Sequence, residues 1–228
     1  SWKPIIFFSL IIVVLIIVAN LPFFKVKTVT LSGDVNESVE TQLEGIKGRS
    51  IFSGAVSRQV ETLKNDYTIE SFKCRKGLPS TVSCQLITKK PTAVWQSGKD
   101  FFYIDSDGVV FSQQDVIIPG QFVIEDRMLL PVKIGAIVLS PEIIGHFQNL
   151  KYLLEEQQFV VDRFIITESL FQVTARVSKG EKQSIEVYFL LSNNLLESVT
   201  SLVKTFDSQG QAVQKSVDLR VPGSVYVR

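Results

Sequence analysis

An uninterrupted apolar run near the start of the chain constrains the fold more than any other feature. The run covers Ile5–Phe24, has no charged residue, and is Ile, Leu, Val or Phe at sixteen of its twenty positions. Twenty helical residues rise about 30 Å, which matches the hydrocarbon core of a bilayer. A buried helix of a soluble domain seldom runs this long without a polar face. The run therefore predicts a single transmembrane helix within residues 1–24.

A cleaved signal peptide is the main alternative, since a basic flank and an apolar run are also typical of one. The run is longer than the usual apolar region of a signal peptide, about 7–15 residues, and no small-x-small site follows it, which favours retention as an anchor. Charge gives no orientation, because Lys3 precedes the run while Lys25 and Lys27 follow it. The chain begins with Ser1, so we expect a native segment to precede it.

Composition excludes several classes of function. The chain has 24 basic and 23 acidic residues and a net charge of +1, which gives no electrostatic footprint for nucleic acid. His146 is the only histidine, and with two cysteines it forms no recognisable zinc pattern. No phosphate-binding loop, nucleophile elbow or paired-carboxylate motif is present. We therefore expect no catalysis, no cofactor, no metal and no small-molecule substrate.

Apolar periodicity after the run predicts a small domain in the order strand, helix, helix, strand, strand. The strands are expected at residues 26–33, 67–76 and 80–89, and the helices at 36–48 and 55–65. Two helices can pack on one face of such a three-stranded sheet.

Cys74 and Cys84 lie in the last two of these strands, on either side of a turn around Pro79. If the strands pair as a hairpin, the two cysteines lie opposite each other, close enough for a disulfide. The alternative is that they are two small apolar residues in a strand pair.

Strands predominate beyond Lys90–Pro91, the expected domain boundary. A hairpin is expected where Asp105 and Gly108 provide the turn between two apolar runs. Prolines and glycines break up Val116–Leu139, which predicts short edge strands and irregular connections. Helical spacing follows over residues 140–157 and 194–206, with three strand-like runs between them. The fold class is therefore α+β, with two helices packed on the sheet of a β-rich domain.

The chain ends in an alternating segment, residues 216–228, which predicts a half-buried strand with a bulge at Pro222-Gly223. The odd positions that share one face are Val217, Leu219, Val221, Val225 and Val227. The even positions on the other face are Asp218, Arg220, Ser224, Tyr226 and Arg228.

Several of these passages together resemble the FtsQ/DivIB family of bacterial cell-division proteins. The order β-α-α-β-β just beyond an anchor is similar to a POTRA domain. The matching positions are Pro79, Thr81, Lys90, Pro91, Ala93 and Trp95 around the domain junction, Asp105, Gly108 and Phe111 in the hairpin, and Asp218-Leu219-Arg220 near the end. The resemblance implies an anchor in residues 1–24, a POTRA domain in 25–90 and the family's β domain in 91–228.

The resemblance also implies a function. It points to a non-enzymatic, single-pass protein of the bacterial cytoplasmic (inner) membrane, located at the division septum, with a cytoplasmic N-terminus and extracytoplasmic domains. Such a protein links early and late divisome components and helps regulate septal peptidoglycan synthesis. The implied partners are division proteins of the FtsB/FtsL type, which add a strand to the terminal edge strand.

The residues expected to bind such a partner are Val221, Ser224, Val225, Tyr226, Val227 and Arg228. Tyr226 is the expected energetic anchor, since aromatic residues lead interface hot spots; the alternative is that it only covers the sheet. Supporting structural roles are expected for Asp105, Gly108, Asp218 and Arg220. Two other functions stay open: a POTRA-bearing chaperone or secretion component that binds unfolded β-strands, and an anchored enzyme that depends on His146.

Overall fold

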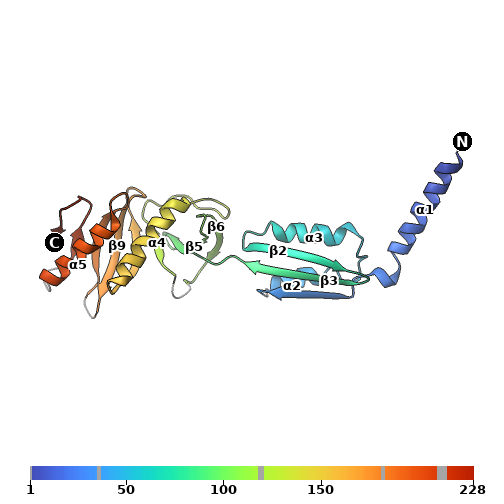
Figure 1. Cartoon of the computed structure of the whole chain (residues 1–228), viewed down its shortest axis with the longest axis horizontal. Helices are drawn as coiled ribbons and strands as arrows, with labels where there is room; N and C mark the ends of the chain where they lie inside the picture. Colours follow the sequence, from blue (N-terminus) through green and yellow to red (C-terminus); the bar gives the residue numbers. More distant parts are fainter. Residues whose placement is uncertain (1, 35–36, 118–120, 181–182, 210–214) are drawn as a thin grey trace. The chain divides into compact units, whose positions relative to one another are not determined.

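The computed structural model describes residues 2–34, 37–117, 121–180, 183–209 and 215–228. The chain forms two compact units, Ser1–Lys89 and Lys90–Arg228, which Figure 1 draws in blue to green and in green to red. The division falls beside Lys90–Pro91, where the sequence predicts a boundary.

The apolar run forms a helix that is shorter than predicted. Helix α1 (Lys3–Ala19) ends at Asn20, whose backbone N–H donates to the carbonyls of Ile16 and Ile17 at 3.2 and 3.1 Å. Leu21 then takes an extended conformation, because a following proline disfavours the helical one. A 3-10 turn, η1 (Pro22–Phe24), completes the run. The predicted continuous helix to Phe24 is therefore wrong in its extent, and no helix in the described residues is long and apolar enough to cross a membrane.

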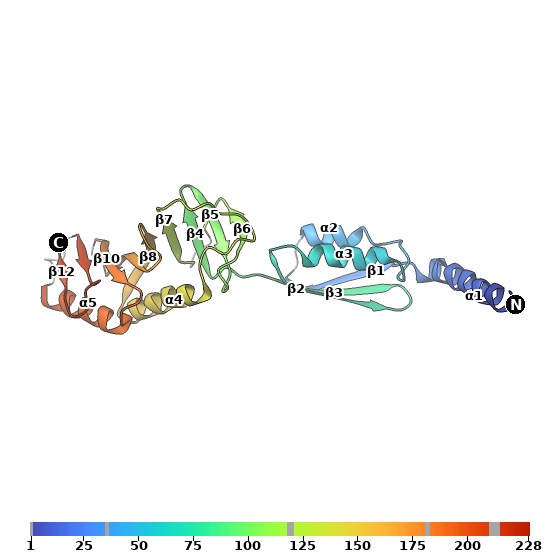
Figure 2. The same ribbon diagram turned by 90° about the horizontal axis from the view of Figure 1, so that it is seen from above.

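The rest of the first unit is a three-stranded sheet with two helices. Its elements are β1 (Thr28–Gly33), α2 (Glu37–Glu44), α3 (Gly54–Lys64), β2 (Ile69–Gly77) and β3 (Thr81–Thr88). Strand β3 is central, parallel to β1 and antiparallel to β2. Both helices lie on one face of the sheet (Figure 2). This is the element order predicted from the sequence.

The core of this unit lies between that face and the helices. Val39 and Leu43 of α2 and Val56 and Leu63 of α3 are buried, as their helical spacing predicts. Cys74 of β2 lies directly opposite Cys84 of β3 in the strand register, and a disulfide joins them.

The second unit is built on a nine-stranded sheet in the order β12-β11-β10-β9-β8-β7-β4-β5-β6. The strands are β4 (Ala93–Ser97), β5 (Asp100–Ile104), β6 (Val110–Gln114), β7 (Val123–Asp126), β8 (Phe159–Ile166), β9 (Gln172–Lys179), β10 (Ile185–Leu190), β11 (Ser216–Asp218) and β12 (Tyr226–Val227). Helices α4 (Pro141–Glu156) and α5 (Leu195–Gln209) cover one face (Figure 2).

Helix α4 begins where the sequence predicts. The hydroxyl of Ser140 accepts a hydrogen bond from the Ile143 N–H at 3.3 Å, and Pro141 holds the first helical position. Phe147 of α4 then packs against Phe164 of β8, with ring centroids 5.2 Å apart. Alternate strand residues face this core, which leaves the other face of β9–β12 mainly to polar side chains.

Part of the Val116–Leu139 prediction is wrong, because β7 is an internal strand and not an edge. It pairs in parallel with both β4 and β8, and Val123 and Ile124 are buried on opposite faces. Pro131 and Gly135 come after the strand, so they do not interrupt it. Pro119 and Gly120 fall within residues 118–120, which lie outside the described part of the chain. The buried Asp126 ends β7 by accepting the N–H groups of Met128 and Leu130 at 2.8 and 2.9 Å.

Candidate partner-binding edge of the sheet

The end of the chain is a hairpin and not the single bulged strand that its alternation predicts. Strand β11 runs parallel to β10, and β12 returns antiparallel to β11. Between them, Gly223 has a φ of +72°, and the Ser224 N–H donates to the Val221 carbonyl at 3.1 Å. Pro222 and Gly223 therefore reverse the chain direction. Because Val221 and Val225 belong to this turn, they are exposed, whereas Val217 and Leu219 are buried as predicted.

Strand β12 is the last strand in the sheet order. Arg228 and Ser216 exchange both backbone hydrogen bonds, each at 2.9 Å. In an antiparallel pair, hydrogen-bonded residue pairs alternate with non-bonded ones. Val227 is opposite Val217 in a non-bonded pair, so its N–H and carbonyl point away from β11. This is the geometry needed to accept a further strand.

A hollow of about 570 Å³ opens beside β12, on the sheet face away from the helices. The residues that line it come from β10, from β11 and from the end of the chain: Tyr188, Ser216, Asp218, Arg220, Val225, Tyr226, Val227 and Arg228. Tyr226 is 56% exposed, so its ring is available for contact.

Arg220 and Asp218 form a two-pronged ion pair at the rim of this hollow. Arg220 Nε and Nη2 donate to the two carboxylate oxygens of Asp218 at 3.0 and 2.6 Å. These hydrogen bonds hold the pKa of Asp218 below its usual value, although partial burial acts in the opposite direction. The Arg220 guanidinium also lies 5.4 Å from the ring centroid of Tyr188. Partial burial, followed by the nearby carboxylate of Glu186, raises the pKa of Tyr188.

A second hollow of about 190 Å³ shares Tyr188 and Arg220 with the first and extends toward Gln172. The stacked pair thus stands between the two. Tyr188 was not among the residues predicted from the sequence. It lies two positions after Glu186 in β10, so both side chains are on the polar face. That pattern was visible in the sequence, but only the strand order brings Tyr188 next to Arg220.

The other predicted site residues occupy different places. Val221 and Ser224 line a separate hollow of only about 20 Å³ at the turn. Asp105 and Gly108 are in the turn between β5 and β6, where the Asp105 carboxylate accepts the N–H groups of Asp107 and Val109, each at 3.0 Å. Val225–Arg228, Asp218 and Arg220 therefore line the same hollow, whereas Asp105 and Gly108 belong to the turn between β5 and β6.

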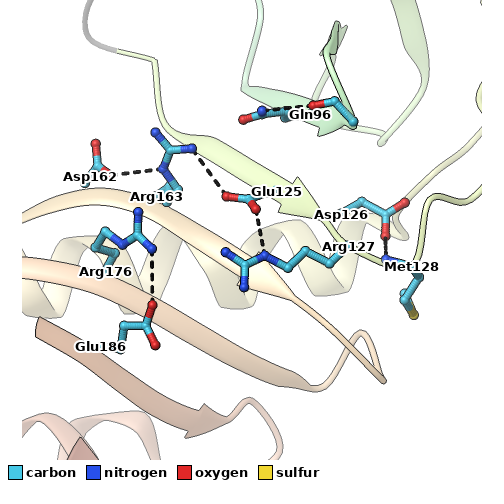
Figure 3. A network of polar contacts seen from close by, with 10 residues as sticks. Gln96, Glu125, Asp126, Arg127, Met128, Asp162, Arg163, Arg176 and Glu186 are labelled. Carbon is cyan, nitrogen blue, oxygen red and sulfur yellow. Dashed lines mark hydrogen bonds and ion pairs between the residues drawn. The ribbon is translucent and has the colours of Figure 1, made fainter. Parts of the chain in front are cut away.

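Two separate groups of ion pairs lie farther along the same polar face (Figure 3). Glu125 of β7 accepts from Arg127 at 2.7 Å and from Arg163 of β8 at 3.3 Å, and Arg176 of β9 donates to Glu186 of β10 at 3.2 Å. Partial burial raises the pKa of Glu125, but the two arginines outweigh it and the net shift is downward. Among the described residues, no cluster of histidine, cysteine or acidic side chains is able to hold a metal ion.

Comparison with known proteins finds partial similarity. No protein-family model matches the chain. The protein named "Cell division protein FtsQ" from Rickettsia bellii (strain RML369-C) is 27% identical over 136 residues, which are 58% of this chain and 48% of the relative. The protein of the same name from Rickettsia felis (strain ATCC VR-1525 / URRWXCal2) is 29% identical over 136 residues, with the same coverage. The chain spans about half the length of these curated relatives.

Proposed function

We propose that this chain is a member of the FtsQ/DivIB family and that it acts in bacterial cell division as a non-enzymatic scaffold at the septum. The relatives named FtsQ support the division role. Among the structural observations, the outward edge of β12 beside a polar hollow carries the proposal, because it offers both a backbone ladder and side-chain selectivity.

In the proposed mechanism, a strand from a division protein of the FtsB/FtsL type pairs with β12. The outward N–H and carbonyl of Val227 provide the first ladder bonds. Tyr226 provides aromatic contact area, and Arg228 provides a charge at the same hollow. The Asp218–Arg220 ion pair fixes both side chains at the rim of the hollow before a partner binds. The entropic cost of ordering them on binding is therefore small. Through this complex the chain links early and late divisome components and helps regulate septal peptidoglycan synthesis.

The proposal includes attachment to the cytoplasmic (inner) membrane through the apolar run Ile5–Phe24, with the N-terminus cytoplasmic, residues 25–228 extracytoplasmic and residues 25–90 a POTRA domain. The exposed apolar side chains of α1 support attachment, since they have no other apolar surface to cover them among the described residues. The disulfide between Cys74 and Cys84 is consistent with an oxidising, extracytoplasmic compartment.

Two experiments test the proposal. A fluorescent fusion in dividing cells is expected to concentrate at the septum; uniform membrane fluorescence would reject the division role. Deleting Val221–Arg228 removes β12 and is expected to abolish capture of the FtsB/FtsL-type partner, while the truncated chain stays in the membrane fraction. Capture of unfolded outer-membrane proteins in place of coiled-coil partners would favour the chaperone function.

A further inference from the structure

One end of the first unit brings together three segments that are far apart in the sequence. In the strand register, the start of β1, the start of β3 and the end of β2 coincide, because Thr28 and Gly77 both pair with Thr81. The segment that follows α1 and the turn between β2 and β3 are therefore neighbours at this end. The loop before α3 joins them, because the Val26 N–H donates to the Arg49 carbonyl at 2.9 Å. We call this surface, made of residues 19–27, 47–52 and 76–80, the α1-proximal end.

Backbone hydrogen bonds fix these segments to one another. The Lys27 N–H donates to the Ser80 carbonyl at 2.8 Å, which ties the β2–β3 turn to the segment after α1. The Ile51 N–H donates to the Phe24 carbonyl at 2.9 Å, which ties in the loop. The Ser50 hydroxyl donates to the carbonyl of Ala19, the last residue of α1, at 2.6 Å. The surface is thus preorganised and directly continuous with the apolar helix.

Large apolar side chains are exposed on this surface. Phe23, Phe52 and Leu78 are 60%, 53% and 67% exposed. Phe24 contacts both other phenylalanines: its ring is edge-to-face with Phe23 at a centroid distance of 5.2 Å and tilted against Phe52 at 5.3 Å. Exposing a cluster of aromatic side chains to water is unfavourable, so this cluster indicates an interaction surface.

The charge on this surface is positive. Lys25, Lys27, Arg49 and Lys76 belong to the same three segments, and all four are exposed. Glu44 is the acidic side chain closest in the chain to the loop, and Lys47 pairs with it. Residues 1–33 contain no acidic residue. Cations around an apolar cluster are complementary to the headgroup region of a bilayer that contains anionic phospholipid.

We propose that the α1-proximal end docks on the surface of an anionic phospholipid bilayer. The phenylalanines and Leu78 insert among the lipid headgroups, and the surrounding cations contact phosphates. The inference rests on the proposed membrane attachment through α1, and it adds a second, headgroup-level contact that fixes the globular part of the unit against the membrane. A bilayer is the occupant because the surface is contiguous with the end of α1 and carries both lipid-complementary features.

Tryptophan quenching tests the docking in the whole chain. Phe52→Trp, in a Trp2→Phe background, leaves the fully buried Trp95 as an internal reference. The chain is reconstituted into phosphatidylcholine vesicles that contain phosphatidylglycerol, with or without brominated acyl chains. We expect brominated lipid to quench the emission of the introduced tryptophan. Leu78→Trp gives an independent probe of the same surface, and Phe171→Trp, a comparably exposed position in the second unit, is the control that is expected to stay unquenched.

The charge requirement has its own test. Each of Lys25→Gln and Arg49→Gln is expected to lower the ratio of docked to undocked chain by about fivefold at low salt. Lys99→Gln and Lys133→Gln, exposed cations of the second unit, are the matched controls and are expected to change nothing.

The outcomes separate the two proposals. Suppose that the Phe52→Trp and Leu78→Trp variants emit equally with brominated and ordinary lipid, in chains that resist alkaline extraction from the vesicles. That result would overturn the docking but keep the attachment. Release of the chain by alkaline extraction would overturn the attachment and the docking that rests on it. Equal quenching in purely zwitterionic vesicles would overturn the requirement for anionic lipid.

Discussion

Replacing Val227 by proline is expected to block strand addition while leaving the β11–β12 hairpin formed. Proline removes the backbone N–H, and Val227 directs that N–H outward. The hydrogen bonds that hold the hairpin belong to the neighbouring residues, with Arg228 and Ser216 bonded twice at 2.9 Å. The substitution therefore removes a group that only an incoming strand needs.

The magnitude follows from the group that is left unpaired. A carbonyl of the added strand, buried against β12 without a donor, costs about 1–3 kcal/mol. This corresponds to a dissociation constant for the partner that is about 5 to 150 times larger. Val227→Ala is the matched control, because it keeps the N–H while it shortens the partly buried side chain. It is expected to lower stability slightly and to retain most of the affinity.

The assay is a titration of the extracytoplasmic segment of the FtsB/FtsL-type partner against the wild type and both variants, followed by fluorescence anisotropy. Thermal unfolding of each variant checks that the second unit is folded. Wild-type affinity in a folded Val227→Pro variant would refute strand addition at this edge. If Val227→Ala lost as much affinity as Val227→Pro, the side chain and not the ladder would carry the binding.

Three further predictions concern stability. Replacing both disulfide cysteines by alanine is expected to lower the free energy of unfolding of the first unit by about 2–3 kcal/mol, a modest amount because the disulfide closes a short loop. A reducing agent should lower the melting temperature of the wild type and leave that of the variant unchanged. Gly108→Ala is expected to destabilise the second unit by more than about 2 kcal/mol in denaturant titrations, since its φ is +74° and the added Cβ would lie 1.9 Å from a main-chain carbonyl oxygen. Gly180→Ala, with a φ of +65° and no atom within 4 Å of the added Cβ, should cost only about 1–2 kcal/mol. Arg220→Gln should return the pKa of Asp218 toward its usual value. A carboxyl whose pKa is lowered in the folded state stabilises the protein above its unfolded pKa, and this stabilisation is lost as the pH falls through the folded pKa. The free energy of unfolding of the variant should therefore be lower than that of the wild type at neutral pH, and the difference should shrink as the pH falls.

The sequence predicted those elements whose signals are local. Apolar spacing on α2 and α3 is a property of neighbouring turns of helix, so the strand-helix-helix-strand-strand order followed from it directly. The start of α4 at Ser140 and Pro141 is equally local, because the cap and the first helical residue are adjacent. The opposition of Cys74 and Cys84 needed only a hairpin with a turn near Pro79.

The strand order of the second unit depended on contacts that no local pattern contains. The prolines and glycines around β7 suggested an edge, yet burial between β4 and β8 makes β7 internal. The alternation of the last residues suited one long strand as well as a hairpin, because the alternation of side chains is the same in both. Only the pairing of β11 with β10 decided between them.

For the candidate site, the sequence alone determined which side chains could contribute. These are Tyr226 and Arg228 in the alternating terminal segment, and Asp218 and Arg220, which are two residues apart. The tertiary structure decided that β12 is an edge, that Val227 points its backbone outward, and that Tyr188 of β10 stacks on Arg220. The physical reason is that an edge is defined by the strand that is missing beside it. Which strand ends a sheet depends on how the whole sheet orders itself, and no short stretch of sequence encodes that order.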